Sequence, residues 1–194
     1  STVLFAAALL AVLGATLILR ADTGIGTIAI QPYDQASRMR CADVQRAVAR
    51  KFGTRTIVLP VRSLPKSAYY APRSRYRADK LLDDLGSLKD YDRVVGITAR
   101  DISTTTRGAK DFGVLGLGQM PGRSCVVSTY RLRAHKKQGL ERVRLERVVI
   151  HEIGHTMGLP HCPTPRCLMQ DANKSIRTVD ASADFCEGCK SRLR

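Results

Sequence analysis

The alternation of apolar and polar positions divides most of the chain into short strands and longer helices. Short apolar or β-branched runs that end near Pro, Gly or Asp are typical of strands buried in a sheet. Such runs occupy residues 27–32, 54–60, 93–99, 111–118 and 124–132. The pattern predicts a compact α/β domain whose sheet contains these strands.

Three segments between or after these runs have helical character. In residues 34–52, valine and phenylalanine side chains recur at every fourth position, and Gly53 is a suitable helix end. A short helix is predicted around residues 78–85, and a longer amphipathic helix over residues 140–157. No repeat or low-complexity linker interrupts the pattern, so residues 23–194 are predicted to form a single domain.

The N-terminal segment departs from this pattern. Residues 3–19 carry no charged side chain, and Arg20 ends the apolar run. A buried core helix can have this composition, but the length lies between that of a signal-peptide core and that of a membrane-spanning helix. We therefore predict that residues 1–22 are an export signal or a membrane anchor, and that the protein is exported or membrane-anchored. If the segment is not a targeting signal, a cytoplasmic location is expected.

The composition adds a strong positive charge. The 194 residues have a formal net charge of +15 and no tryptophan, so the core is expected to be aliphatic. Such a charge would attract nucleic acid, an anionic membrane surface or an acidic substrate. The basic residues are scattered along the chain rather than gathered on one element. A solvated basic surface is therefore favoured over a specific nucleic-acid site.

The predicted helix over residues 140–157 contains the sequence HEIGH, in which His151 and His155 are four positions apart. Residues at i and i+4 lie on one face of a helix, so both imidazoles can bind the same zinc ion. Glu152 is adjacent to His151, where its carboxylate can approach a metal-bound water without binding the metal. A catalytic zinc needs a third protein ligand and keeps one position open for water.

The residues after this helix favour His161 as the third ligand. Gly158 tolerates the left-handed backbone of a helix end, and Pro160 prevents the helix from resuming. The reversed chain can then bring His161 back to the metal. Chance histidines on a surface helix are the alternative interpretation of HExxH alone. Here the helix, the terminating glycine and the third histidine coincide.

The stretch HEIGHTMGLPH, residues 151–161, resembles the HExxHxxGxxH signature of the metzincin metalloproteases. Members of that clan have a methionine in a tight turn below the metal. The resemblance implies that Met169, in RCLMQD, is this Met-turn residue, although an ordinary core methionine would also fit the pattern. Some metzincins have a tyrosine just after the turn, whereas Gln170 and Asp171 follow Met169 here.

Four of the six cysteines form two closely spaced pairs after the helix, Cys162 with Cys167 and Cys186 with Cys189. Two such pairs are the usual layout of a four-cysteine structural zinc site. Disulfides are the serious alternative if the chain is exported, and the CxxC of the second pair is also compatible with a redox motif. The other two cysteines, Cys41 and Cys125, are interpreted as free buried side chains, although a disulfide between them is also compatible with the sequence.

The pattern HC-x4-C-x-M followed by C-x2-C resembles the archaemetzincins, a metzincin branch in which four such cysteines hold a second, structural zinc. The likeness extends to LPKSAYYAPRSRYRADKLLDDL, VVGITARDIS, FGVLGLG and VVSTYRL, and so spans about residues 27–189. It implies an α/β (α+β) metzincin-like single domain with a twisted mixed five-stranded sheet, an active-site helix and a short zinc-stapled C-terminal region. It also implies two zinc ions per chain, a catalytic one on His151, His155 and His161 and a structural one on the four cysteines.

A zinc-dependent metallopeptidase is therefore the predicted function, with Glu152 as the general base that activates a zinc-bound water. The expected substrate is a peptide or protein, extended along residues 113–119 by β-augmentation, as metzincin substrates typically lie. We expect a monomer with no specific nucleic-acid partner, and membrane attachment through the N-terminal segment is also compatible with the sequence. The alternative is a non-enzymatic zinc protein whose basic surface binds nucleic acid or membrane. An intact Glu152 beside an open coordination position argues for the enzyme.

Overall fold

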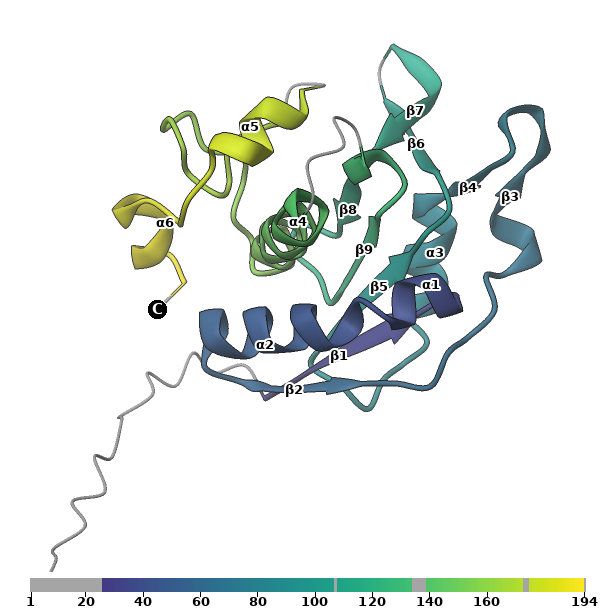
Figure 1. The fold of residues 1–194 in the computed structure, drawn as a ribbon, viewed down its shortest axis with the longest axis horizontal. Coiled ribbons are helices and arrows are strands. Elements are labelled where there is room, and N and C mark those ends of the chain that lie inside the picture. The colour runs from purple at the N-terminus through teal and green to yellow at the C-terminus, as the bar shows by residue number, and fades with distance from the viewer. Residues whose placement is uncertain (1–25, 107, 134–138, 173–174, 194) are drawn as a thin grey trace, which may run out of the picture.

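The computed structural model describes residues 26–106, 108–133, 139–172 and 175–193 (Figure 1). The predicted signal or anchor segment, residues 1–22, lies outside these ranges, so that interpretation stays a prediction. Within the described ranges, no helix combines the length and the apolar character that crossing a membrane requires.

A five-stranded sheet forms the centre of the domain, in the strand order β2-β1-β5-β9-β8. Its strands are β1 (Thr27–Pro32), β2 (Arg55–Val58), β5 (Arg93–Thr98), β8 (Gly116–Gly118) and β9 (Ser124–Ser128). The first four strands in the spatial order are parallel, and β8 pairs antiparallel with β9 at the edge. The predicted α/β domain with a mixed five-stranded sheet is confirmed.

Helices cover both faces of this sheet (Figure 1). The α-helices are α1 (Gln35–Arg38), α2 (Cys41–Phe52), α3 (Ala78–Leu85), α4 (Leu140–Thr156), α5 (Ile176–Ala181) and α6 (Glu187–Ser191). Because successive strand residues point to opposite faces, Val95 and Val127 pack with α2 and α4, whereas Val94 and Val126 pack with α3. Full burial of each such side chain contributes about 1.5–3 kcal/mol. Burial on both faces explains why these strands are apolar runs without strict alternation.

The two cysteines outside the paired set lie in the core between the sheet and helices α2 and α4. Cys41 begins α2, and Cys125 is on β9. Both are buried and free, as predicted.

A second, smaller sheet stands beside the first, in the order β3-β4-β6-β7. Its strands are β3 (Tyr69–Tyr70), β4 (Arg75–Arg77), β6 (Ile102–Thr106) and β7 (Ala109–Val114). The described residues also include the 3-10 helices η1 (Lys66–Ala68), η2 (Ala71–Arg73) and η3 (Arg131–Arg133). The single strand predicted over residues 111–118 is wrong, because β7 pairs with β6 and β8 pairs with β9. Leu115 lies between them, and its carbonyl accepts a hydrogen bond from the Ser128 N–H at 2.9 Å. The run therefore crosses from one sheet to the other.

The helix predicted over residues 34–52 is two helices, α1 and α2. Asp34 starts α1 through a capping box in which its side chain accepts from the Ser37 N–H at 2.7 Å. The same carboxylate accepts from the Ala99 N–H at 2.8 Å, which ties this start to the end of β5. Helix α2 ends at Gly53 with φ of 64°, as predicted. The chain changes direction between the capped start of α1 and the first residue of α2, Cys41. Apolar periodicity does not reveal this boundary, so the sequence predicted one helix.

Candidate metal centre and active-site cleft

Helix α4 and the loop after it bring the three predicted histidines together. His151 and His155 lie one turn apart on α4, with ring centroids 4.6 Å apart. The ring of His161, from the loop, lies 4.8 Å from that of His155 and 5.4 Å from that of His151. One candidate ligand atom from each of the three lies within 4.8 Å of the others. The predicted triad is therefore a spatial cluster.

The turn that ends α4 also orients His155. Gly158 has φ of 88°, the left-handed conformation expected of a residue after a helix end. Its N–H donates to the His155 carbonyl at 2.9 Å, and the Leu159 N–H donates to the Gly154 carbonyl at 3.0 Å. The returning chain places the Leu159 carbonyl 2.8 Å from Nδ1 of His155. Two residues later the same turn delivers His161 to the cluster.

The two helix histidines are held in the metal-binding tautomer. Nδ1 of His151 lies 2.6 Å from the Leu168 carbonyl, and Nδ1 of His155 lies 2.8 Å from the Leu159 carbonyl. A carbonyl oxygen can only accept, so Nδ1 carries the hydrogen and the lone pair of Nε2 is left for a metal. Burial lowers the pKa of His151 to about 4 and also lowers the pKa of His155, so both rings are neutral near pH 7. Three imidazoles that open onto a cleft match the ligand set of a catalytic zinc.

Glu152 lies on α4 between the first two histidines and faces β8. It is 6% exposed, and burial raises its pKa to about 8, which a hydrogen bond from the Gly118 N–H opposes. A Cβ atom at Gly116 would stand 2.6 Å from Oε1 of Glu152. Any larger residue at position 116 would therefore force the Glu152 side chain to move.

Met169 packs directly beneath the histidine cluster. Its side chain is fully buried, and its Sδ would be 2.6 Å from a Cβ atom at Gly154, between His151 and His155 in α4. The Met169 carbonyl accepts a hydrogen bond from the Cys162 N–H at 2.8 Å. Met169 therefore supports the part of α4 that carries the two histidines, and its role as the Met-turn residue stays a prediction.

The four paired cysteines form a second cluster. All four are free thiols, and one candidate ligand atom from each lies within 4.8 Å of the others. Sγ of Cys162 lies 3.7 Å from Sγ of Cys186, and Sγ of Cys167 lies 3.8 Å from Sγ of Cys189. A zinc tetrahedron with Zn–S bonds of about 2.3 Å has edges of about 3.8 Å. The spacing fits one zinc ion and is almost twice the roughly 2.05 Å of a disulfide bond.

Backbone N–H groups support part of this cluster. A hydrogen bond from the Cys189 N–H lowers the pKa of Cys186 to about 6. The Cys186 N–H in turn donates to Sγ of Cys167 at 3.3 Å. Burial and the neighbouring thiols act in the opposite direction on Cys189, whose pKa is raised. Four sulfur atoms this close need a cation to become thiolates together.

A family model for peptidase family M54 matches residues 19–194. This chain belongs to peptidase family M54. The archaemetzincin of Methanopyrus kandleri is 38% identical over 135 residues, which cover 68% of this chain and 73% of that protein. The archaemetzincin of Halobacterium salinarum strain R1 is 35% identical over 145 residues, which cover 69% of this chain and 80% of that protein.

Solved structures of archaemetzincins share the fold. The crystal structure of the Methanopyrus kandleri protein superimposes with a TM-score of 0.73 at 30% identity, covering 91% of this chain and 97% of that one. The Archaeoglobus fulgidus protein, crystallised with malonate, also gives a TM-score of 0.73, at 29% identity, covering 86% of this chain and 99% of that one. This archaemetzincin chain is therefore a zinc metallopeptidase, and its histidine and cysteine clusters fit a catalytic and a structural zinc. The comparisons thus support the enzyme rather than the non-enzymatic alternative.

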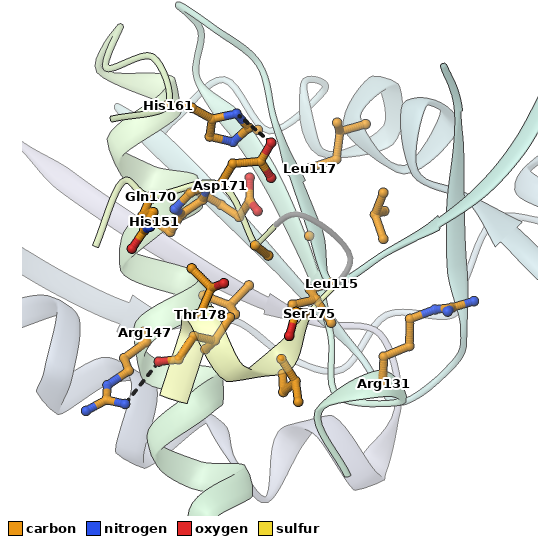
Figure 2. Close-up of a pocket in the computed structure, with 18 of the residues that line it drawn as sticks. Leu115, Leu117, Arg131, Arg147, His151, His161, Gln170, Asp171, Ser175 and Thr178 are labelled. Atoms are coloured by element: carbon orange, nitrogen blue, oxygen red, sulfur yellow. Dashed lines mark hydrogen bonds and ion pairs between the residues drawn. The ribbon is translucent and has the colours of Figure 1, made fainter. Parts of the chain in front are cut away.

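The histidines open into a cleft of about 1370 Å³. Residues 112–118, which run from β7 through Leu115 into β8, line one side, and α5 with residues 170–172 lines another (Figure 2). A site for one small ligand measures roughly 300–1000 Å³, so this cleft has room for an extended peptide. Of residues 113–119, which were predicted to line the cleft, residues 113–118 do so, whereas Gln119 is not among the lining residues.

Several parts of the site were not found in the sequence. The carbonyls of Leu159 and Leu168 have no sequence signal, because every residue carries one. Gly116 and Gly118 were placed in the strand predicted to contact substrate, but the sequence did not link them to the Glu152 carboxylate. Asp171 lies 3.7 Å from Nδ1 of His161 and was noted only for not being a tyrosine. The one feature of the sequence that points to Asp171 is its position two residues after Met169, the predicted Met-turn residue.

Proposed function

We propose that this archaemetzincin hydrolyses peptide bonds with Glu152 as the general base, and that His151, His155 and His161 hold the catalytic zinc. The observation that carries the proposal is the position of Glu152. Its buried carboxylate lines the cleft beside the histidine cluster but outside the set of candidate ligands. A purely structural metal site has no use for a carboxylate in that place.

The chain's own residues perform the proton transfers. Zinc at this site would supply a Lewis acid, which lowers the pKa of water from about 15.7 towards about 7 and polarises a carbonyl. Glu152 accepts the proton of the attacking water and then delivers it to the departing amine. The Gly118 N–H holds the carboxylate in place during both transfers. Nδ1–H contacts to the Leu159 and Leu168 carbonyls keep two imidazoles aligned for the metal.

The substrate is a peptide or protein that lies extended along β8. Alternate residues of an antiparallel pair exchange hydrogen bonds with the neighbouring strand. Leu115 and Gln119 bond to β9, through the Ser128 N–H at 2.9 Å and the Ser124 carbonyl at 3.0 Å. Residues Gly116 and Gly118 between them therefore direct backbone groups towards the open edge of the sheet. Apart from the Gly118 N–H, which donates to the Glu152 carboxylate, the backbone groups of this edge can pair with a substrate backbone by β-augmentation.

We also propose that the structural zinc is held by Cys162, Cys167, Cys186 and Cys189. The chain is proposed to act as a monomer.

Residues 1–22 are proposed to export the protein or attach it to a membrane, because residues 3–19 are uncharged and apolar. A Leu10→Arg substitution should then release the protein from sedimented membranes or block its export. Equal fractionation of both proteins would contradict targeting by this segment.

Replacing Glu152 with glutamine tests the proposed mechanism. General acid–base catalysis typically contributes about 10²–10⁴-fold, so kcat for a reporter peptide should fall by at least about 100-fold. The zinc content of the protein should not change, since Glu152 is not a ligand. Glu146→Gln, on the same helix and paired with Arg142, is the matched control. Cleavage by Glu152→Gln at the wild-type rate would show that the mechanism is wrong.

A further inference from the structure

Each of the three histidines directs Nδ1 towards an oxygen atom, but the third oxygen is of a different kind. His151 and His155 face backbone carbonyls, at 2.6 and 2.8 Å. Nδ1 of His161 faces the Asp171 carboxylate, with 3.7 Å to Oδ2. This distance is within ion-pair range and longer than a hydrogen bond. Figure 2 shows the two side chains directed at one another on one side of the cleft.

His161 is the ligand that most needs such a partner. His151 and His155 are fixed by α4 and by their carbonyl contacts, and His155 is buried. The side chain of His161 stands on a loop and is 50% exposed. A half-exposed side chain on a loop retains rotamer freedom that metal binding must remove. A group that restricts the ring beforehand therefore favours metal binding.

The backbone that carries Asp171 is held in a defined place relative to His161, while the Asp171 side chain itself is 62% exposed. Within the short segment between them, the Cys162 N–H donates to the Met169 carbonyl at 2.8 Å. The Gln170 N–H donates to the Cys167 carbonyl at 3.0 Å, which closes a tight turn just before Asp171. The turn that contains Met169 thus brings the carboxylate back beside the loop that carries His161.

We infer that Asp171 is a positioning residue that orients His161 for the catalytic zinc. A carboxylate beside Nδ1 favours the tautomer with hydrogen on that nitrogen, because a lone pair there would face the negative charge, and this leaves the Nε2 lone pair for the metal. The carbonyls of Leu159 and Leu168 select the same tautomer in the other two rings. The negative charge of Asp171 also favours a cation at the cluster. This inference rests on the proposed catalytic role of the three histidines.

The test is the zinc affinity of the histidine site, measured by competition with a chromophoric chelator on the full chain. Partners of metal-binding histidines typically change affinity by about 10- to 100-fold, so Asp171→Ala should weaken zinc binding by that factor. Asp171→Glu should restore most of the affinity, because it retains a carboxylate. Asp171→Asn, which keeps the shape and removes the charge, should lie between alanine and wild type.

Asp90→Asn is the charge control, because it removes an exposed carboxylate from the turn between α3 and β5. It should leave zinc affinity unchanged, and all variants should retain the zinc of the cysteine cluster. An affinity of Asp171→Ala within twofold of wild type would overturn the inference. A rise confined to KM for peptides with a free amino terminus would also overturn it, since Asp171 would then bind substrate. Failure of the proposed function is a separate result, in which the wild-type histidines bind no zinc.

Discussion

The residues around the histidine cluster are positioned chiefly by backbone groups and by the absence of side chains. Two imidazoles are oriented by the carbonyls of Leu159 and Leu168. The observed position of Glu152 requires a glycine of β8 opposite its carboxylate, because a Cβ atom there would displace it. The HExxH pattern and the third histidine make the metal ligands recognisable in the sequence. The carbonyls and glycines that position these side chains act through backbone geometry, which no residue type reveals.

A single methyl group at Gly116 should disturb catalysis without disturbing the metal. In Gly116→Ala, Cβ would lie 2.6 Å from Oε1 of Glu152, so the carboxylate must move. A displacement of about 1 Å in a catalytic group can lower the rate by about 100-fold, and we expect kcat to fall between 10- and 100-fold. The kinetics of peptide cleavage and the zinc content are the measurements.

Gly108→Ala is the control, because a Cβ atom there meets nothing within 4 Å. It should cleave at the wild-type rate. Unchanged kcat in Gly116→Ala would show that the carboxylate position is not restricted by β8.

Among the elements, α5 depends on two arginines of α4. Arg144 is 1% exposed and makes two hydrogen bonds to the Asp180 carboxylate, at 2.6 and 2.7 Å. Arg147 donates to the carbonyls of Val179 at 3.0 Å and Asp180 at 2.8 Å. A helix of six residues has little stability of its own. These contacts therefore hold α5 in place as a wall of the cleft.

Removing the partner of the buried arginine should destabilise the fold. Asp180→Ala leaves the buried Arg144 guanidinium with the Leu132 carbonyl but without its carboxylate, and because Asp180 is 29% exposed the cost should lie near the lower end of the roughly 3–5 kcal/mol of a buried pair. Urea denaturation should show a free energy of unfolding lower by about that amount. Arg142→Ala, which removes an exposed pair with Glu146, should change it by no more than about 0.5 kcal/mol. Equal stability of the two variants would mean that α5 is not anchored through Arg144.

The elements that the sequence predicted well are those with strong local signals. Helix α4 was predicted over residues 140–157 and is observed at Leu140–Thr156, because its apolar periodicity and its terminating glycine agree. The smaller sheet was missed. Strands β3, β4 and β6 are short or rich in threonine and arginine, as in Ile102–Thr106 and Arg75–Arg77, so they show no apolar run, and β7 was predicted as part of a strand of the main sheet. Their pairing arises from tertiary contacts rather than from local sequence.

For the molecule as a whole, the two candidate zinc sites are joined at one peptide bond. His161 belongs to the histidine cluster and Cys162 to the cysteine cluster. A second link passes through Leu168, which follows Cys167 and whose carbonyl contacts His151 at 2.6 Å. Ions in the two sites would therefore restrict the same backbone.

Loss of the cysteine site should consequently weaken the histidine site. In a Cys186→Ser, Cys189→Ser variant, the segments that carry His161 and Leu168 lose their common anchor. We expect the zinc affinity of the remaining site to fall by about 10-fold or more, as for other losses of support around ligands. Chelator competition measures this, and unchanged affinity would mean that the two sites are independent.

Zinc per chain, measured by mass spectrometry at saturating zinc, tests the central claim most directly. The structure predicts two ions in the wild-type protein and one in the Cys186→Ser, Cys189→Ser variant, with the histidine site still filled. One zinc in the wild-type protein, together with no titratable thiol among the four clustered cysteines, would instead mean disulfides and would contradict the two-zinc arrangement.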